Sequence, residues 1–211
     1  MAHGPQPRNV ERGGEKVRRR QRATVVFIGF VLLSSLLAAC GAEQPNPVAP
    51  TAAIPDAASE HFQKGNELAG QGKFAEAIGE YQLALEENPD NVSALVNLGV
   101  AYYNAGQLED AVGQYQKALQ IAPNDADIHS NLGAAYVQQG NLDAGLEEYQ
   151  KAVELDPNLA QAYFGLGVVH DALEQTEEAI AAFETFQQLD EGQDSVASDL
   201  AQQYLERLKG Q

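Results

Sequence analysis

The pattern of apolar residues between 92 and 125 predicts two successive amphipathic helices. Leu95, Leu98 and Tyr102 follow the i, i+3, i+7 spacing that gathers side chains on one helical face, and this first helix is expected to end near Asn104. After a turn, a second stripe of the same period runs through Leu108, Ala111, Val112, Tyr115 and Leu119. Pro123 lacks a backbone N–H and ends the second helix. Asn124 or Asp125 is then expected to cap the next helix.

This two-helix pattern recurs along the chain at an interval of 34 residues. A unit of this length cannot bury its own apolar stripe, so the interval predicts a stack of helix pairs. Four columns of residues keep the interval: the glycines Gly65, Gly99, Gly133 and Gly167; the small residues Ala77, Ala111, Gly145 and Ala179; the aromatic residues Tyr81, Tyr115, Tyr149 and Phe183; and the prolines Pro89, Pro123 and Pro157.

The glycine column predicts close packing inside each unit. Glycine within a helix costs about 1 kcal/mol relative to alanine, so we expect it only where a neighbouring backbone comes close. The small-residue column lies where that neighbouring helix is expected. The aromatic column is expected to fill the space between successive helix pairs.

These columns resemble the tetratricopeptide repeat family over residues 58–193. The resemblance implies an all-α fold: a right-handed α-solenoid of four helix-turn-helix repeats, with a concave and a convex face. The repeats are expected at 58–91, 92–125, 126–159 and 160–193. The outer repeats match the pattern less well, and repeat four has Glu174 in place of the turn glycine. Such departures are typical of terminal units in a stack.

Residues 194–211 are expected to form a C-terminal capping helix. Val196, Leu200, Tyr204 and Leu208 recur every fourth residue and are opposed by polar side chains. This stripe predicts a final helix that covers the open end of the stack. An independent dimerising helix is the alternative.

The N-terminal region has the order of charged and apolar residues found in export signals. Arg18, Arg19, Arg20 and Arg22 precede an uncharged run of 17 residues, 23–39, which is at the lower limit for crossing a bilayer of about 30 Å. The run leads into Leu-Ala-Ala-Cys-Gly at 37–41, which resembles the lipobox of bacterial lipoproteins. The resemblance implies a signal peptide over residues 1–39, cleavage before Cys40 and lipidation of the Cys40 thiol. An uncleaved helical anchor is the alternative.

Residues 40–57 are expected to form the lipidated terminus and a proline-rich tether. Pro45, Pro47, Pro50 and Pro55 lie among small residues without a hydrophobic period, a composition typical of extended linkers. At about 3.1 Å per residue in the polyproline form, such a tether reaches roughly 50 Å. We therefore expect a bacterial cell-envelope protein, lipid-anchored to the outside of the cytoplasmic membrane or to the outer membrane.

The charge of the chain limits its partners. Without residues 1–39 the chain has 6 basic and 28 acidic residues, a net charge of −22. Phosphate backbones and anionic lipids repel such a surface, so no nucleic acid is expected as a partner, and membrane contact is expected through the lipid anchor only. A basic partner is permitted, although solubility alone also explains the charge. Cys40 is the only cysteine, so the fold is expected to hold without disulfides.

The resemblance also implies a peptide-binding groove, because members of this family bind ligands on the concave surface lined by the first helix of each repeat. Asn97 and Asn131 occupy the same place in adjacent repeats, where both amides are able to donate to and accept from an extended backbone. Asp127 and Asp171 are the only charges expected on this face. Solvation of an exposed helix face is the alternative role for the asparagines. The expected groove residues are Phe62, Asn66, Asn97, Val100, Tyr103, Asn131, Gln138 and Phe164.

Catalysis and metal binding find little support in the sequence. His61 and His129 share one repeat column and are expected to be structural, and no histidine has a second ligand at i+3 or i+4. No enzyme activity and no cofactor are therefore expected. The leading hypothesis is a membrane-tethered module that binds a peptide or helix of a partner protein, as a scaffold or adaptor for envelope assemblies. A passive structural or self-associating lipoprotein and a cryptic hydrolase are the alternatives.

Overall fold

The computed structural model describes residues 57–210, and within this range the chain forms nine α-helices and no β-strand. The helices are α1 (Ala57–Gly70), α2 (Phe74–Glu87), α3 (Val92–Asn104), α4 (Leu108–Ile121), α5 (Ala126–Gln138), α6 (Leu142–Leu155), α7 (Ala160–Ala172), α8 (Thr176–Asp190) and α9 (Ser195–Lys209). The predicted signal peptide, the predicted lipidation site at Cys40 and the tether as far as residue 56 lie outside the described residues.

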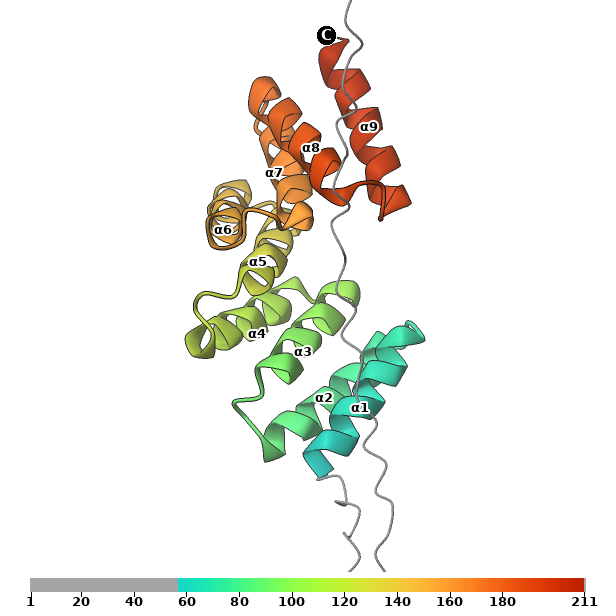
Figure 1. The fold of residues 1–211 in the computed structure, drawn as a ribbon. Coiled ribbons are helices and arrows are strands. Elements are labelled where there is room, and N and C mark those ends of the chain that lie inside the picture. Colours follow the sequence, from blue (N-terminus) through green and yellow to red (C-terminus); the bar gives the residue numbers. More distant parts are fainter. Residues whose placement is uncertain (1–56, 211) are drawn as a thin grey trace, which may run out of the picture. The chain divides into compact units, whose positions relative to one another are not determined.

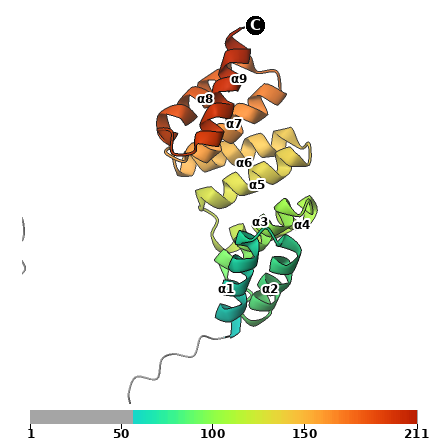
Figure 2. The ribbon, with the colours of Figure 1, turned by 90° about the vertical axis from the view of Figure 1, so that its right-hand side faces the viewer.

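The helices form a solenoid in which each helix packs on the one before it (Figures 1 and 2). Helices α1 and α2, α3 and α4, α5 and α6, and α7 and α8 are the two helices of the four repeats. We call α1, α3, α5 and α7 the first helices, and α2, α4, α6 and α8 the second helices. No helix within residues 57–210 is long and apolar enough to cross a bilayer.

The turn inside each repeat has the same backbone geometry. In the first three repeats Gly72, Gly106 and Gly140 have φ angles of 73°, 76° and 82°, a region in which an L side chain costs roughly 1–2 kcal/mol. The next N–H then bonds back across the turn, as from Gln107 N to Tyr102 O at 2.9 Å. In repeat four Glu174 adopts the same conformation, with φ of 60°.

Short polar side chains begin several of the helices. The Asn91 side chain accepts a hydrogen bond from Ala94 N at the start of α3, and the Asp125 side chain accepts one from Ile128 N at the start of α5. Asp125, rather than Asn124, is therefore the cap of the third repeat. Such caps satisfy N–H groups that have no partner inside the helix.

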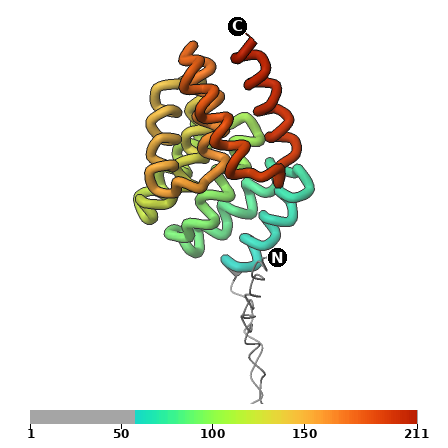
Figure 3. The backbone as a smooth tube through the Cα atoms, turned by 45° about the horizontal axis from the view of Figure 1, so that its top comes forward, coloured from blue at the N-terminus to red at the C-terminus, as the bar shows by residue number. Residues whose placement is uncertain are grey.

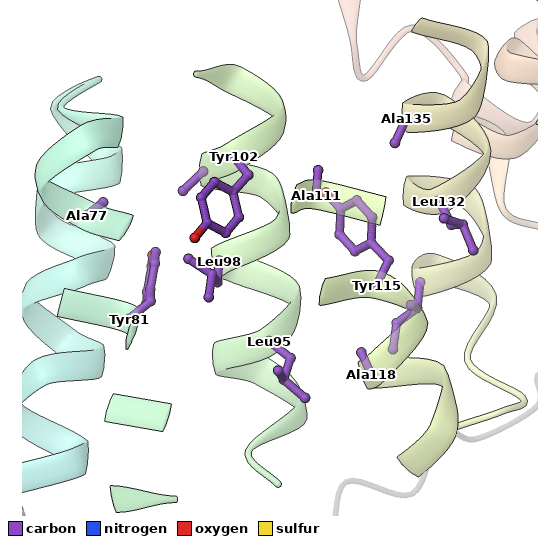
Figure 4. Packing of buried hydrophobic residues seen from close by; sticks show 12 residues of the cluster. Ala77, Tyr81, Leu95, Leu98, Tyr102, Ala111, Tyr115, Ala118, Leu132 and Ala135 are labelled. Atoms are coloured by element: carbon purple, nitrogen blue, oxygen red, sulfur yellow. The ribbon is translucent and has the colours of Figure 1, made fainter. Parts of the chain in front are cut away.

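An aromatic ring, rather than a neighbouring backbone, accounts for the glycine column in three of the four repeats. A Cβ atom on Gly65, Gly99 or Gly167 would lie 2.6 Å from the ring of Tyr81, Tyr115 or Phe183. The expectation of a close backbone was wrong at these positions, because the second-helix ring lies directly against the glycine. Figure 4 shows Tyr81 and Tyr115 at equivalent places in the first two repeats.

Repeat three is the exception, and there the backbones do come close. A Cβ atom on Gly145 would lie 3.1 Å from the carbonyl oxygen of Gly133. The Tyr149 ring lies against Gly133 and also against Gly165 in the next repeat, where a Cβ atom would clash with it. Tyr149 therefore bridges two repeats, whereas its equivalents each contact the glycine of their own repeat.

The last helix packs against α8 (Figure 3). Ala201, Leu205 and Leu208 are buried against α7 and α8. The Tyr204 ring stacks on Phe183, with the two ring centroids 4.8 Å apart. Because no further described helix covers the other side of α9, Val196 on that side is 77% exposed. The predicted capping helix is therefore present.

One surface of the solenoid is formed by the first helices. Helix α1 contacts α3, α3 contacts α5 and α5 contacts α7, and each of these helices also contacts its own second helix. Within residues 57–210 the second helices have no comparable contacts with one another. The first helices therefore lie closer together, and we call the surface that they form the inner face.

Candidate functional site

A hydrogen-bond network joins the first two repeats on the inner face. Tyr81, on α2, donates from its hydroxyl to Asn66 Oδ1 at 2.8 Å, and Asn97 Nδ2 donates to the same oxygen at 2.8 Å. Burial raises the pKa of Tyr81, an increase that the nearby Asn97 amide partly offsets. The two groups fix the orientation of the Asn66 amide, so its Nδ2 group is left to donate outward.

Asn131 lies in the same repeat column as Asn97 but is free of this network. It is half-buried on α5, and none of the described residues bonds to its amide. The equivalent position in the next repeat is Gly165. A side chain there would clash with the Tyr149 ring. The asparagine column therefore ends at Asn131, which keeps its full capacity to bind a ligand.

The other predicted groove residues fall into two groups. Phe62 and Phe164 are half-buried packing residues: the Phe62 ring lies 6.0 Å from Tyr81, and Phe164 packs edge-on against Phe183 and Phe186. The remaining three have surface to offer: Val100 is 37% exposed, Tyr103 is half-buried and Gln138 is exposed in part. The groove formed by these residues stays a prediction.

The hydroxyls of Tyr115 and Tyr149 were not among the predicted site residues. These side chains are only 2% and 7% exposed, and no described residue bonds to either hydroxyl. Burial raises the pKa of both hydroxyls, and the neighbouring phenol of Tyr103 adds to the increase. Both groups are therefore neutral donors at physiological pH. The sequence signal for an unpaired hydroxyl is the residue fifteen positions earlier. That residue is Asn66, an acceptor, for Tyr81, but Val100 for Tyr115 and Ala134 for Tyr149.

Helices α3, α5 and α7 together carry only two acidic residues, Asp127 and Asp171, and no lysine or arginine, although residues 57–210 include 26 acidic and 6 basic residues. The Asp171 carboxylate accepts a hydrogen bond from Arg207 of α9 at 2.7 Å, so the two charges compensate each other. The other basic residues lie elsewhere or are paired: Lys64 with Glu80, Lys151 with Glu154 and Lys209 with Glu184, whereas Lys73 precedes α2 and Lys117 lies on α4. Within the described part of the chain, no first helix carries an unpaired lysine or arginine that would bind an acidic ligand.

Two histidines form pairs that sequence reasoning missed. The Nδ1 atom of His61 lies 2.7 Å from Glu80, and that of His129 lies 2.6 Å from Glu148. Hydrogen bonds from Lys64 and from His61 lower the pKa of Glu80. The signal was a shared spacing of 19 residues in repeats one and three. Each pair joins the two helices of its repeat, and within residues 57–210 no group of three or more metal-type ligands is found.

Family comparisons agree with this architecture. Four sequence models described as tetratricopeptide repeat or TPR repeat match residues 62–126, 114–147, 134–174 and 160–193. Together they span residues 62–193, so the chain belongs to the tetratricopeptide repeat family. The predicted right-handed α-solenoid of four repeats with a C-terminal capping helix is confirmed. A comparison with curated protein sequences finds no match.

Solved structures of the same family resemble the chain. The crystal structure of MamA protein is 25% identical, covers 72% of this chain and 90% of its own, and has a TM-score of 0.59. YrrB, described as a TPR protein with an unusual peptide-binding site, is 25% identical over 66% of this chain and 72% of its own, with a TM-score of 0.55. The first TPR of Spaghetti (RPAP3), bound to the HSP90 peptide SRMEEVD, is 27% identical over 57% of this chain and 95% of its own, with a TM-score of 0.55.

Proposed function

We propose that the inner face binds a segment of another protein and that the chain acts as a scaffold or adaptor in the bacterial cell envelope. The observation that carries the proposal is the part of the inner face formed by α3, α5 and α7, which has only two charged residues in a strongly acidic domain. It presents the exposed Val100 and, among the described residues, an unpartnered amide on Asn131. The two similar structures whose descriptions name a peptide support it. Enzymatic activity is no part of this proposal.

Site-specific photo-crosslinking tests the binding role. A photoreactive amino acid replaces Val100 on the inner face or, as a matched control, Leu83 on α2, because the two side chains are 37% and 40% exposed. In the native cell, Val100 is expected to yield one prominent adduct that Leu83 does not yield. Asn131→Ala should weaken that adduct, since its amide bonds to no described residue. Identical adducts from both positions, or none from Val100, would contradict an inner-face partner.

We further propose that the chain is tethered to a membrane through lipid on Cys40. The basic region, the 17-residue apolar run and the lipobox-like sequence at 37–41 support this. A Cys40→Ser variant should fail to incorporate labelled palmitate and should keep residues 1–39, as mass spectrometry would detect. Palmitate incorporation by the Cys40→Ser variant at the level of the parent chain would overturn the anchor, whatever the inner face binds.

Self-association is a second candidate function, and one observation favours it. Val196 is 77% exposed and Leu200 is 40% exposed on the same side of α9. Two such stripes are able to bury each other in a dimer. Sedimentation of the full-length chain in detergent separates the two candidates: a dimer that Leu200→Glu dissociates supports self-association, and a monomer at all concentrations excludes it.

A further inference from the structure

The second-helix aromatic residue and the residue fifteen positions before it match in polarity in only two of the four repeats. In repeat one the Tyr81 hydroxyl has an acceptor, Asn66 Oδ1, at 2.8 Å. In repeat four both positions are apolar, Phe183 and Val168, so no acceptor is needed. Repeats two and three keep the tyrosine but not the acceptor.

Tyr115 and Tyr149 therefore have hydroxyls that the fold does not satisfy. The equivalents of Asn66 are Val100 and Ala134, which offer no side-chain acceptor. Within residues 57–210 only Ser130 Oγ is both fully enclosed and unpartnered, so the tyrosine oxygens are not sealed inside the core. An acceptor from outside the chain is therefore able to reach both oxygens and to take the place of solvent there.

The first repeat indicates which surface the hydroxyls of Tyr115 and Tyr149 face. The Tyr81 hydroxyl reaches Asn66 on α1 and lies beside the Asn97 amide on α3, both on the inner face. Tyr115 packs against Gly99 of α3 in the same manner, and Tyr149 packs against Gly133 of α5 and Gly165 of α7. Both rings therefore run from a second helix toward the inner face. The Tyr103 phenol is close enough to both hydroxyls to raise their pKa values.

The acceptor that fits these donors is uncharged. Within residues 57–210 no first helix carries an unpaired lysine or arginine that would attract a carboxylate. A domain with 26 acidic residues also repels acidic segments. A backbone carbonyl oxygen has the required chemistry.

We propose that Tyr115 and Tyr149 donate hydrogen bonds to backbone carbonyl oxygens of an uncharged, proline-rich extended segment of a partner protein. A polyproline II segment has no internal hydrogen bonds, so its carbonyl oxygens are free. Proline also lacks an N–H group, so the segment brings few donors that this face would leave unpaired. Aromatic surfaces are a recurrent way to bind such segments. This inference rests on the proposed inner-face binding and specifies its ligand.

Peptide binding to the full-length chain in detergent tests the inference. The probes are a hexaproline peptide with blocked ends and the acidic peptide SRMEEVD, both followed by calorimetry. Hexaproline is expected to bind more tightly. Tyr115→Phe and Tyr149→Phe should each weaken it by about fivefold to tenfold, the usual range for one hydrogen bond. The variants keep the buried rings and remove hydroxyls that bond to no described residue, so their melting temperatures should match the parent chain.

Tyr136→Phe is the control, because the Tyr136 hydroxyl lies beside α4, where it accepts a hydrogen bond from Gln116 Nε2 at 2.9 Å. It should bind hexaproline as the parent chain does. Tighter binding of SRMEEVD, or undiminished hexaproline binding by the Tyr115→Phe, Tyr149→Phe double variant, would overturn the inference. If hexaproline does not bind while crosslinking from Val100 persists, the ligand chemistry is wrong and the proposed function stands. Loss of both would overturn both.

Discussion

Gly99 and Gly113 lie in the two helices of one repeat but in opposite surroundings. A Cβ atom on Gly99 would lie 2.6 Å from the Tyr115 ring, whereas a Cβ atom on Gly113 would meet nothing within 4 Å. The first glycine is required by packing. The second only carries the entropic cost of glycine in a helix.

Alanine at these two positions should therefore change stability in opposite directions. Gly113→Ala is expected to raise the free energy of unfolding by about 1 kcal/mol through helix propensity. Gly99→Ala is expected to lower it by about 1–3 kcal/mol, because the Tyr115 ring is held on all sides and must shift. Urea denaturation followed by circular dichroism measures both. Equal effects of the two substitutions would contradict the packing of the Tyr115 ring on Gly99.

Glu174 offers a further test at the residue scale. It adopts a φ of 60° at the turn position where the other three repeats have glycine. Glu174→Gly should raise the free energy of unfolding by about 0.5–1 kcal/mol, since relief of the left-handed strain exceeds the added chain entropy. Gly106→Ala, at the equivalent turn of repeat two, is the control and should be destabilising. A destabilised Glu174→Gly variant would indicate that the Glu174 side chain contributes more than its strain costs.

At the scale of the element, α9 continues the repeat register as a fifth first helix. Leu200 lies 34 residues after Leu166 and 68 after Leu132, and Ala201 falls in the glycine column. Leu132 is 2% exposed, whereas Leu200 is 40% exposed. The same column thus has two environments because no second helix covers α9 in the described part of the chain.

Truncation of these two leucines should show the difference directly. Leu132→Ala is expected to cost about 2–5 kcal/mol of unfolding free energy, as for other fully buried leucines. Leu200→Ala should cost less than about 1 kcal/mol, because much of the side chain already faces solvent. Thermal and urea denaturation of both variants provide the measurement. A loss at Leu200 as large as that at Leu132 would mean that another segment or a second copy covers this side of α9.

The whole molecule is held together by contacts between neighbouring helices and strained by its charge. With 26 acidic and 6 basic residues in 57–210, exposed carboxylates repel one another along the solenoid. The thermal midpoint should therefore rise by a few degrees as sodium chloride increases from about 0.02 to about 0.3 M, over which the screening length falls to about 6 Å. A midpoint that falls with salt would instead show that ion pairs such as Lys64 with Glu80 dominate.

Sequence reasoning predicted the helices and turns well, and the binding face only in part. The second repeat was expected as a helix ending near Asn104 and another ending before Pro123, and α3 and α4 have these limits. The neighbours of individual side chains were harder. The tie between Asn66 and Asn97, the bridge of Tyr149 to Gly165 and the pair of His129 with Glu148 all join residues of different helices.

The sequence by itself determined the helical period, the 34-residue register and the family, because these depend on spacing and side-chain size within one unit. Only the tertiary structure decided which glycines face a ring and which tyrosine hydroxyls lack an acceptor. The physical reason is that each of these contacts depends on how neighbouring helices pack, and one departure from the column, such as Gly145 where the other repeats have alanine, changes that packing locally. The same repeat pattern therefore encloses a satisfied Tyr81 and leaves the hydroxyls of Tyr115 and Tyr149 without a partner among the described residues.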